Sequence, residues 1–120
     1  MCGIFAVSGS NNNAGSFVLA GLKKLEYRGY DSWGVAVRSL DGIKTEKEVG
    51  KISHIDKKFA TGNEAFGHSR WATHGGVTKA NAHPHKFGKI TLAHNGVCEN
   101  FLELKSEFDA SDFVSETDSE

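Results

Sequence analysis

The chain has 120 residues, of which 38% are hydrophobic and 10% aromatic, which is enough apolar material for one small folded domain and too much for a disordered segment. Its 14 lysines and arginines nearly balance 15 acidic residues, and a formal net charge of −1 gives no electrostatic basis for binding nucleic acid or an anionic membrane. Apolar runs fall short of the roughly 20 residues that span a bilayer, no signal peptide is evident, and two cysteines do not make a disulfide framework, so we expect a cytoplasmic protein.

The first part of the chain predicts a strand followed by a helix. Residues 4–8 are a short run of β-forming apolar residues. The polar residues 10–15 are expected to form a loop. Ser16 then predicts the start of an amphipathic helix over residues 17–27, because a serine hydroxyl can accept a hydrogen bond from a free N–H at a helix N-terminus. Gly29 is expected to end this helix.

The next segment has the alternation typical of a β-hairpin. Residues 33–39 and 43–49 predict two strands, and Asp41-Gly42 between them is a strong turn signal. Residues 51–59 predict a short helix. The apolar residues expected on its inner face are Ile52, Ile55 and Phe59.

The last part of the chain predicts two more strands, a helix and a final strand. Residues 65–71 and 89–94 predict strands, and Asn95-Gly96 breaks the second one. The final elements are an amphipathic helix over residues 101–108 that begins at Asn100, and a strand that runs into a polar turn over residues 113–118.

These elements favour an α+β layered fold, because strands and helices do not alternate regularly as they do in a parallel βαβ series. The chain stops directly after the last predicted strand, so we expect a truncated domain.

Cys2 is the candidate reactive residue. The processing peptidase removes methionine before small residues, so the loss of Met1 would make Cys2 the N-terminal residue. Its thiol would be a nucleophile, and its own α-amine, with an unperturbed pKa of about 7.7–8.0, would be a base. One residue would then supply both groups, as in the N-terminal-threonine hydrolases. Most cysteines at position 2 are simply small residues, so Cys2 needs support from motifs elsewhere in the chain.

Five short motifs give this support, and they occur in order along the chain. They are Cys2-Gly3-Ile4-Phe5, Tyr27-Arg28-Gly29-Tyr30-Asp31-Ser32, Arg70-Trp71-Ala72-Thr73-His74-Gly75, His94-Asn95-Gly96 and Ser115-Glu116-Thr117-Asp118. Together they resemble the class II, N-terminal-nucleophile glutamine amidotransferases. The second and third motifs, with Asn81-Ala82-His83-Pro84-His85 and with the fourth motif followed by Glu99-Asn100, favour the branch of this family whose ammonia acceptor is fructose 6-phosphate.

The resemblance implies part of the four-layer αββα sandwich of the N-terminal-nucleophile (Ntn) hydrolases, in which helices flank antiparallel sheets. It implies hydrolysis of L-glutamine to glutamate and ammonia through a thioester on Cys2, without a cofactor. In the parent enzyme the ammonia would convert fructose 6-phosphate to glucosamine 6-phosphate, in isomerase domains absent from this chain. Residues 1–120 would be the N-terminal portion of a glutamine amidotransferase type 2 domain, and the full-length parent is expected to be an oligomer.

Glutamine hydrolysis assigns roles to the motif residues. Asn95 and Gly96 would supply N–H donors to the oxyanion that forms when the thiolate attacks the amide. Arg70 suits the α-carboxylate of glutamine, because its planar fork can bind both oxygens. Asp118 suits the ammonium group. Taken singly, Asn95-Gly96 would be a tight turn, Arg70 a surface charge and Asp118 a turn residue, and only their combination favours a substrate site.

Other motif residues are expected to support this site. Trp71, Thr73 and His74 would line it. Arg28 lies beside the nucleophile in the family, where it either takes part in the site or only holds its loop. The remaining supporting residues are His83 and His94.

Two other interpretations stay open. His74, His83, His85 and His94 could form a zinc site, although no cysteine pair has metal-ligand spacing and we expect no metal. Alternatively, the chain could be a non-catalytic fragment that binds glutamine or a partner.

Cys98 is expected to be a small core residue.

Overall fold

The computed structural model describes residues 1–9 and 11–120. Ser10, at the start of the predicted loop, lies outside the described residues. The elements in chain order are β1 (Gly3–Ser8), α1 (Ala14–Leu25), η1 (Glu26–Arg28), β2 (Ser32–Ser39), β3 (Gly42–Val49), β4 (Glu64–Arg70), β5 (His85–Phe87), β6 (Ile90–Leu92), α2 (Phe101–Lys105) and η2 (Ala110–Asp112), where η marks a short 3₁₀ helix.

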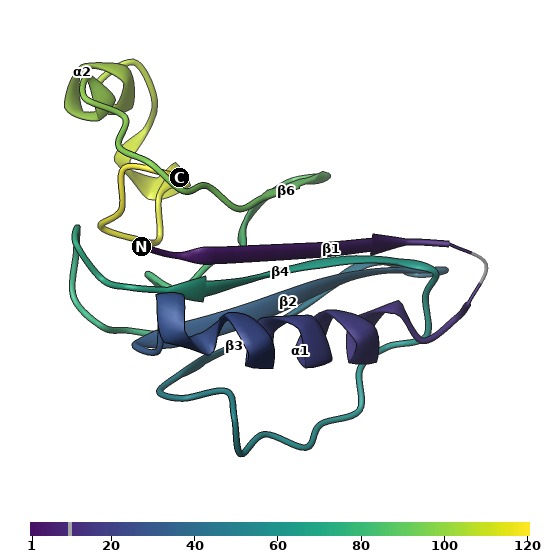
Figure 1. Ribbon diagram of the computed structural model, residues 1–120. Helices are drawn as coiled ribbons and strands as arrows, with labels where there is room; N and C mark the ends of the chain where they lie inside the picture. The colour runs from purple at the N-terminus through teal and green to yellow at the C-terminus, as the bar shows by residue number, and fades with distance from the viewer. Residues whose placement is uncertain (10) are drawn as a thin grey trace.

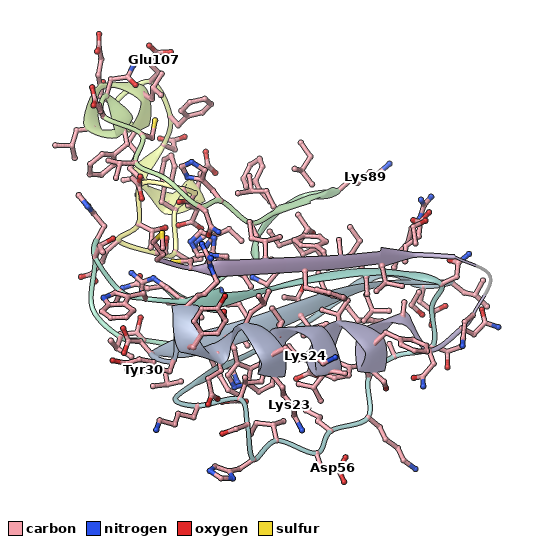
Figure 2. The ribbon with its side chains drawn as sticks, viewed as in Figure 1. Lys23, Lys24, Tyr30, Asp56, Lys89 and Glu107 are labelled. Atoms are coloured by element: carbon pink, nitrogen blue, oxygen red, sulfur yellow. The ribbon has the colours of Figure 1, made fainter. Side chains whose placement is uncertain are left out.

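Four strands form one antiparallel sheet in the order β1-β4-β2-β3, and β5 pairs with β6 in a separate hairpin. Helix α1 lies along one face of the large sheet, and the chain from β5 onward lies on the other side (Figure 1). In the side-chain view, Lys23 and Lys24 lie on the α1 side, whereas Lys89 and Glu107 lie beyond the opposite face (Figure 2). The α+β class with antiparallel sheets is therefore confirmed, as one sheet layer and one helical layer of the expected Ntn-hydrolase sandwich.

The core lies between α1 and the sheet. Its buried hydrophobic residues are Ala14, Val18, Leu19, Leu22, Trp33, Val35, Val37, Ile52 and Ala65. Glycines let the helix approach closely: a Cβ at Gly67 would lie 2.7 Å from Leu22 Cδ1, and one at Gly21 would lie 2.5 Å from the ring of Phe5. Because close packing leaves no room for these extra atoms, the two glycines set the distance between helix and sheet.

The first four predicted strands are confirmed within one or two residues, as is the hairpin. Ser39 pairs with Gly42, so Leu40 and Asp41 make the turn between β2 and β3. Gly42 has a φ of +106°, which explains why glycine stands there.

The start of the predicted helix was wrong by three residues. Helix α1 begins at Ala14 with Asn13 before it, and Ser16 lies inside the helix. Gly29 ends the helical stretch as predicted, but through close packing. Its φ of −172° is extended, and a Cβ there would lie 2.6 Å from the backbone carbon of Arg70.

The helix predicted for residues 51–59 does not form. One turn at residues 52–55, closed by the hydrogen bond from Ile55 N to Ile52 O at 3.0 Å, is followed by chain without regular secondary structure. Strands β3 and β4 are both antiparallel to β2, so the connection between them must return along the sheet. A nine-residue helix would span only about 14 Å of that path. Ile52 still enters the core, and Ile55 and Phe59 pack against it.

The C-terminal predictions were only partly right. The strand over residues 89–94 is shortened to β6, which pairs with the unpredicted strand β5. Helix α2 ends at Lys105, before the predicted residue 108. Residues 113–118 form turns and no strand, because their backbone N–H groups find side-chain partners. The carboxylate of Glu120 accepts hydrogen bonds from Val114 N at 3.1 Å and Ser115 N at 2.6 Å.

Across the described ranges, 1–9 and 11–120, the longest helices are too short or too polar to cross a membrane.

Candidate active site

Cys2 precedes β1, where the antiparallel register places it beside the end of β4. Gly3 pairs with Ser69, so the chain before β1 meets the chain after β4. The Trp71 N–H donates to Cys2 Sγ at 3.3 Å, and the cysteine is half-buried. The sulfur therefore lies at Trp71, the first residue of the loop that follows β4, which we call the Arg70 loop. Cys2 and Trp71 are 69 residues apart in the sequence.

Asn95, in the loop that follows β6, also contacts Cys2. Its Nδ2 donates to the carbonyl oxygen of Cys2 at 3.1 Å, and its Oδ1 accepts from Nε2 of His68 at 2.8 Å. Gly96 has a φ of +155°, and a Cβ there would lie 2.6 Å from Nε2 of His94. The predicted Asn-Gly pair is thus brought to the predicted nucleophile, in a conformation that requires glycine.

Arg28 also contacts the N-terminal segment. Its Nε donates to the carbonyl oxygen of Cys2 at 3.4 Å, and its Nη2 lies 3.7 Å from Sδ of Met1. The close packing of Gly29 on the end of β4 places the arginine there. Two donors, from Arg28 and Asn95, therefore meet on one carbonyl and orient the residue that carries the thiol.

Arg70 is the last residue of β4 and is only 4% exposed, so it is not a surface charge. Its guanidinium donates to the carbonyls of the loop that follows: to Gly76 at 3.0 Å, to Gly75 at 3.5 Å and to His74. Burial lowers the pKa of Arg70, and the nearby Asp31 and Asp118 carboxylates partly offset this effect.

Sequence reasoning missed two residues that hold the Arg70 loop, Asn81 and Glu116. Asn81 Nδ2 donates to Gly76 O at 3.0 Å and to Glu116 Oε2 at 2.9 Å, while Glu116 N donates to Asn81 Oδ1 at 2.9 Å. Glu116 Oε2 also accepts from Gly76 N at 3.2 Å. The hydrogen bond from Asn81 is the main reason that the pKa of Glu116 is lowered. Asn81 begins the motif over residues 81–85, and Glu116 belongs to the motif over residues 115–118. Their polar side chains within these motifs could have indicated a role in the site.

Asp118 faces the segment that follows Gly96. Its Oδ2 accepts from the backbone N–H of Cys98 at 2.7 Å, and its Oδ1 from Ser119 Oγ at 3.4 Å. Nδ1 of His94 lies 3.2 Å from the same serine hydroxyl. Cys98 is half-buried in this loop and is not a core residue, contrary to the expectation.

The three residues expected to line the site lie on the loop after β4, and all are exposed. Trp71 is 43% exposed, with its ring centroid 5.5 Å from that of Tyr30. The His74 ring meets Phe101 edge-on at 5.5 Å. Thr73 lies between them in sequence.

Three buried histidines lie beneath Asn95, and His68 was not among the predicted residues. The rings of His68 and His83 stack at 4.3 Å with 18° between their planes, and His83 meets His85 at 4.5 Å and 65°. Burial lowers the pKa of His68 and of His85 to about 4, and that of His83 still further. The signal for His68 was a histidine inside a predicted strand.

In the part of the chain that the structure describes, no group of three histidine, cysteine, aspartate or glutamate side chains could hold a metal ion. The site instead combines a thiol, amide and backbone N–H donors, a buried guanidinium and a carboxylate. This donor set suits attack on an amide carbonyl, because it offers a nucleophile together with donors for a developing oxyanion.

Comparisons with known proteins show what the chain is similar to. No protein-family model matches the chain. It is 48% identical over 126 residues to a Streptococcus pyogenes serotype M1 protein and 49% identical over 128 residues to one from Thermus thermophilus, both named glutamine–fructose-6-phosphate aminotransferase [isomerizing]. A Methanococcus maripaludis protein of the same name is 50% identical over 128 residues. Each match covers 100% of this chain, and the chain spans 21% of each relative.

Two solved structures have a similar fold. One is the glutamine phosphoribosylpyrophosphate amidotransferase of B. subtilis with ADP and GMP (TM-score 0.73, 26% identity, 89% of this chain and 24% of the other). The other is described as the allosteric regulatory enzyme of purine biosynthesis (TM-score 0.78, 26% identity, 98% and 27%).

The fold and these similarities show that the chain belongs to the family of N-terminal-nucleophile, class II glutamine amidotransferases, as a fragment of such a protein. Within the family, its whole length matches the N-terminal region of the glutamine–fructose-6-phosphate aminotransferases.

Proposed function

We propose that this chain carries out the glutaminase half-reaction, the hydrolysis of L-glutamine to glutamate and ammonia through a thioester on Cys2. The observation that carries the proposal is the convergence of Asn95, Arg28 and Trp71 on Cys2 from three separate segments. A cysteine whose backbone carbonyl and sulfur both receive hydrogen bonds from distant motifs is held in place, as a nucleophile must be.

The first step is attack of the Cys2 sulfur on the side-chain amide carbon of glutamine. Removal of Met1 would free the α-amine of Cys2, which takes the thiol proton and returns it to the departing nitrogen. The carbon–nitrogen bond breaks, ammonia leaves, and the acyl group stays on sulfur as a thioester. Water then hydrolyses the thioester, which yields glutamate and regenerates the thiol.

Asn95 and Gly96 are the proposed oxyanion donors. The Asn95 amide has two N–H groups, one of which is directed at the carbonyl of Cys2, so the other can donate to the oxyanion next to the sulfur. The backbone N–H of Gly96 is the second donor. Loss of one such donor typically lowers the rate about 10²- to 10³-fold.

Arg70 and Asp118 are the proposed clamp for the two charged ends of free glutamine. The contacts of Arg70 with the carbonyls of residues 74–76 use three of its five N–H donors, which leaves two for the α-carboxylate. The carboxylate of Asp118 would accept hydrogen bonds from the ammonium group of glutamine. Trp71, Thr73 and His74 would line the pocket, with Arg28, His83 and His94 in supporting positions.

The same proposal extends to the parent enzyme. Residues 1–120 would be the N-terminal portion of a glutamine amidotransferase type 2 domain, and the isomerase domains would lie outside this chain. In that cytoplasmic, oligomeric parent, a glutamine–fructose-6-phosphate transaminase (isomerizing), the ammonia would reach fructose 6-phosphate and yield glucosamine 6-phosphate. The names of the relatives support this acceptor.

An intact-mass measurement tests the proposal, before and after treatment with a diazo-ketone analogue of glutamine. We expect the loss of one methionine and a single adduct that maps to Cys2. Cys98→Ala is the matched control, because it removes the second cysteine and should leave the adduct unchanged. Met1 removal without an adduct, or an adduct on Cys98, would contradict the proposed site. Glutamine that binds without any turnover would favour the non-catalytic alternative.

A further inference from the structure

A cluster of three buried histidines, in which His68 stacks on His83 and His83 meets His85 edge-on, links the sheet to the two loops that carry the residues proposed to bind the oxyanion and the ammonium group. His68 belongs to β4, while His83 and His85 come from the segment that crosses the sheet at Gly34. Gly34 pairs with His68 in the register, and a Cβ there would clash with the carbonyl oxygen of His83. The missing side chain on β2 therefore makes the space in which the histidines stack.

Each histidine also contacts a loop of the site. His68 Nε2 meets Asn95 Oδ1 at 2.8 Å, and His83 Nδ1 accepts from the backbone N–H of His94 at 3.2 Å. His85 Nε2 lies 3.0 Å from Oγ1 of the buried Thr117, the residue before Asp118. All three rings are at most 4% exposed, although Asn95 itself is exposed, and of the three contacts only the one between His85 and Thr117 is fully buried.

The contact with Asn95 requires one tautomer of His68. Asn95 Nδ2 donates to Cys2 O, so the atom that faces His68 is the acceptor Oδ1, and Nε2 of His68 must carry the proton. Nδ1 of His68 meets no partner with good hydrogen-bond geometry among the residues that the structure describes, although the backbone of His94 lies close enough to favour a protonated ring. Burial outweighs this effect and is the main reason that the pKa of His68 is lowered, so the charged ring is disfavoured.

We infer that His68, held by its stack on His83, is the positioning residue of the oxyanion site: its Nε2–H fixes Oδ1 of Asn95 and thereby aims the amide N–H groups at Cys2. This inference rests on the proposed function, because it assigns a task within that reaction. His68 itself lies behind Asn95 and acts through it. The low pKa values of the buried rings agree with this role, because they keep the stack neutral at pH 7.

Two substitutions separate positioning from packing. His68→Phe keeps a ring in the stack but removes the N–H, whereas His68→Gln replaces that donor with an amide N–H. We expect His68→Phe to lower kcat for glutamine about 10- to 100-fold with KM within about twofold, because Asn95 acts on the transition state. His68→Gln should recover most of that loss. The control is His54→Phe, which changes an exposed histidine outside the site and should leave kcat unchanged.

The ¹⁵N resonances of the His68 ring give a measurement that needs neither a variant nor activity. At pH 7 we expect Nε2 protonated and Nδ1 unprotonated. A charged ring or the Nδ1–H tautomer overturns the inference, as does a His68→Phe protein with wild-type kcat or a loss confined to KM. If the wild-type chain does not turn over glutamine, the proposed function is wrong and the task assigned to His68 is overturned with it, whereas the ring spectrum still tests the His68–Asn95 contact separately.

Discussion

The two faces of the large sheet differ in what holds them together. The face toward α1 is apolar and closely packed, with Leu22 and Val35 fully buried and glycines at the points of closest approach. The other face carries His68 and Arg70, which are equally buried but make directed hydrogen bonds to loops. One face therefore stabilises the fold by excluding water, while the other uses burial to orient polar groups.

Apolar residues on the side of the sheet away from α1 are left uncovered. Phe87 and Ile90 of the β5–β6 hairpin are 63% and 66% exposed, and Phe108 beyond α2 is 62% exposed. These residues line a shared apolar hollow with Leu92 and Phe113. On this side of the sheet, the buried residues are thus concentrated near Cys2, where His68, His83 and His85 lie.

The largest expected effect comes from Cys2, which lies at the end of the sheet next to the face that carries His68 and Arg70. Cys2→Ala removes the proposed nucleophile, and we expect glutamine hydrolysis to fall by at least about 10³-fold with the unfolding midpoint unchanged. Ammonia release and urea denaturation measure the two quantities. Retention of full activity by Cys2→Ala would show that this face does not carry the proposed chemistry.

The helical face should respond in the opposite way. Leu22→Ala leaves a cavity between α1 and the sheet, and we expect the free energy of unfolding to fall by about 2–5 kcal/mol. The rate of Cys2 modification by the glutamine analogue should stay near that of the wild type under conditions where the variant is folded. Leu40→Ala is the control, because Leu40 is fully exposed in the β2–β3 turn. Equal losses from both variants would contradict the assignment of the core.

Acid should weaken the histidine face first. The folded-state pKa values of His68 and His85, about 4, lie below the value of about 6.5 for an exposed histidine, so the unfolded chain binds more protons between these values. Stability is then fully present above about pH 6.5 and is lost as the pH falls toward 4.

Between pH 7.5 and 5 we expect a loss on the order of 2 kcal/mol in the free energy of unfolding for each of these two histidines. Urea titrations across this range measure it, and His68→Gln should reduce the slope because it removes one of the buried rings. A free energy of unfolding that stays constant or rises on acidification would contradict the neutral stack.

The smallest effect should come from the uncovered apolar residues. Phe87→Ser removes an exposed ring, and we expect the free energy of unfolding to change by no more than about 0.5 kcal/mol. Light scattering should show less self-association, because the variant has less exposed apolar surface. A loss of several kcal/mol would mean that this ring contributes to the fold described above.

Local sequence patterns predicted an element correctly where the pattern of apolar residues matched the pattern of burial in the tertiary structure. The alternation in residues 33–39 and 65–71 indicates strands because one face of each is buried against α1. The prediction failed for residues 51–59, where helical spacing of apolar residues occurs in a connection that has one turn and no regular secondary structure after it. It also failed for residues 113–118, where carboxylates cap the backbone and no strand partner is near in the described residues.

The sequence by itself determined the motifs, their order and therefore the family, because the identity of a reactive side chain does not depend on where the chain folds. Only the tertiary structure decided which groups meet. It brings Asn95 to Cys2 across 93 residues and places His68 behind them. That role needs a buried face of the sheet, a glycine at position 34 and two further histidines, and such long-range packing leaves no local pattern in the sequence.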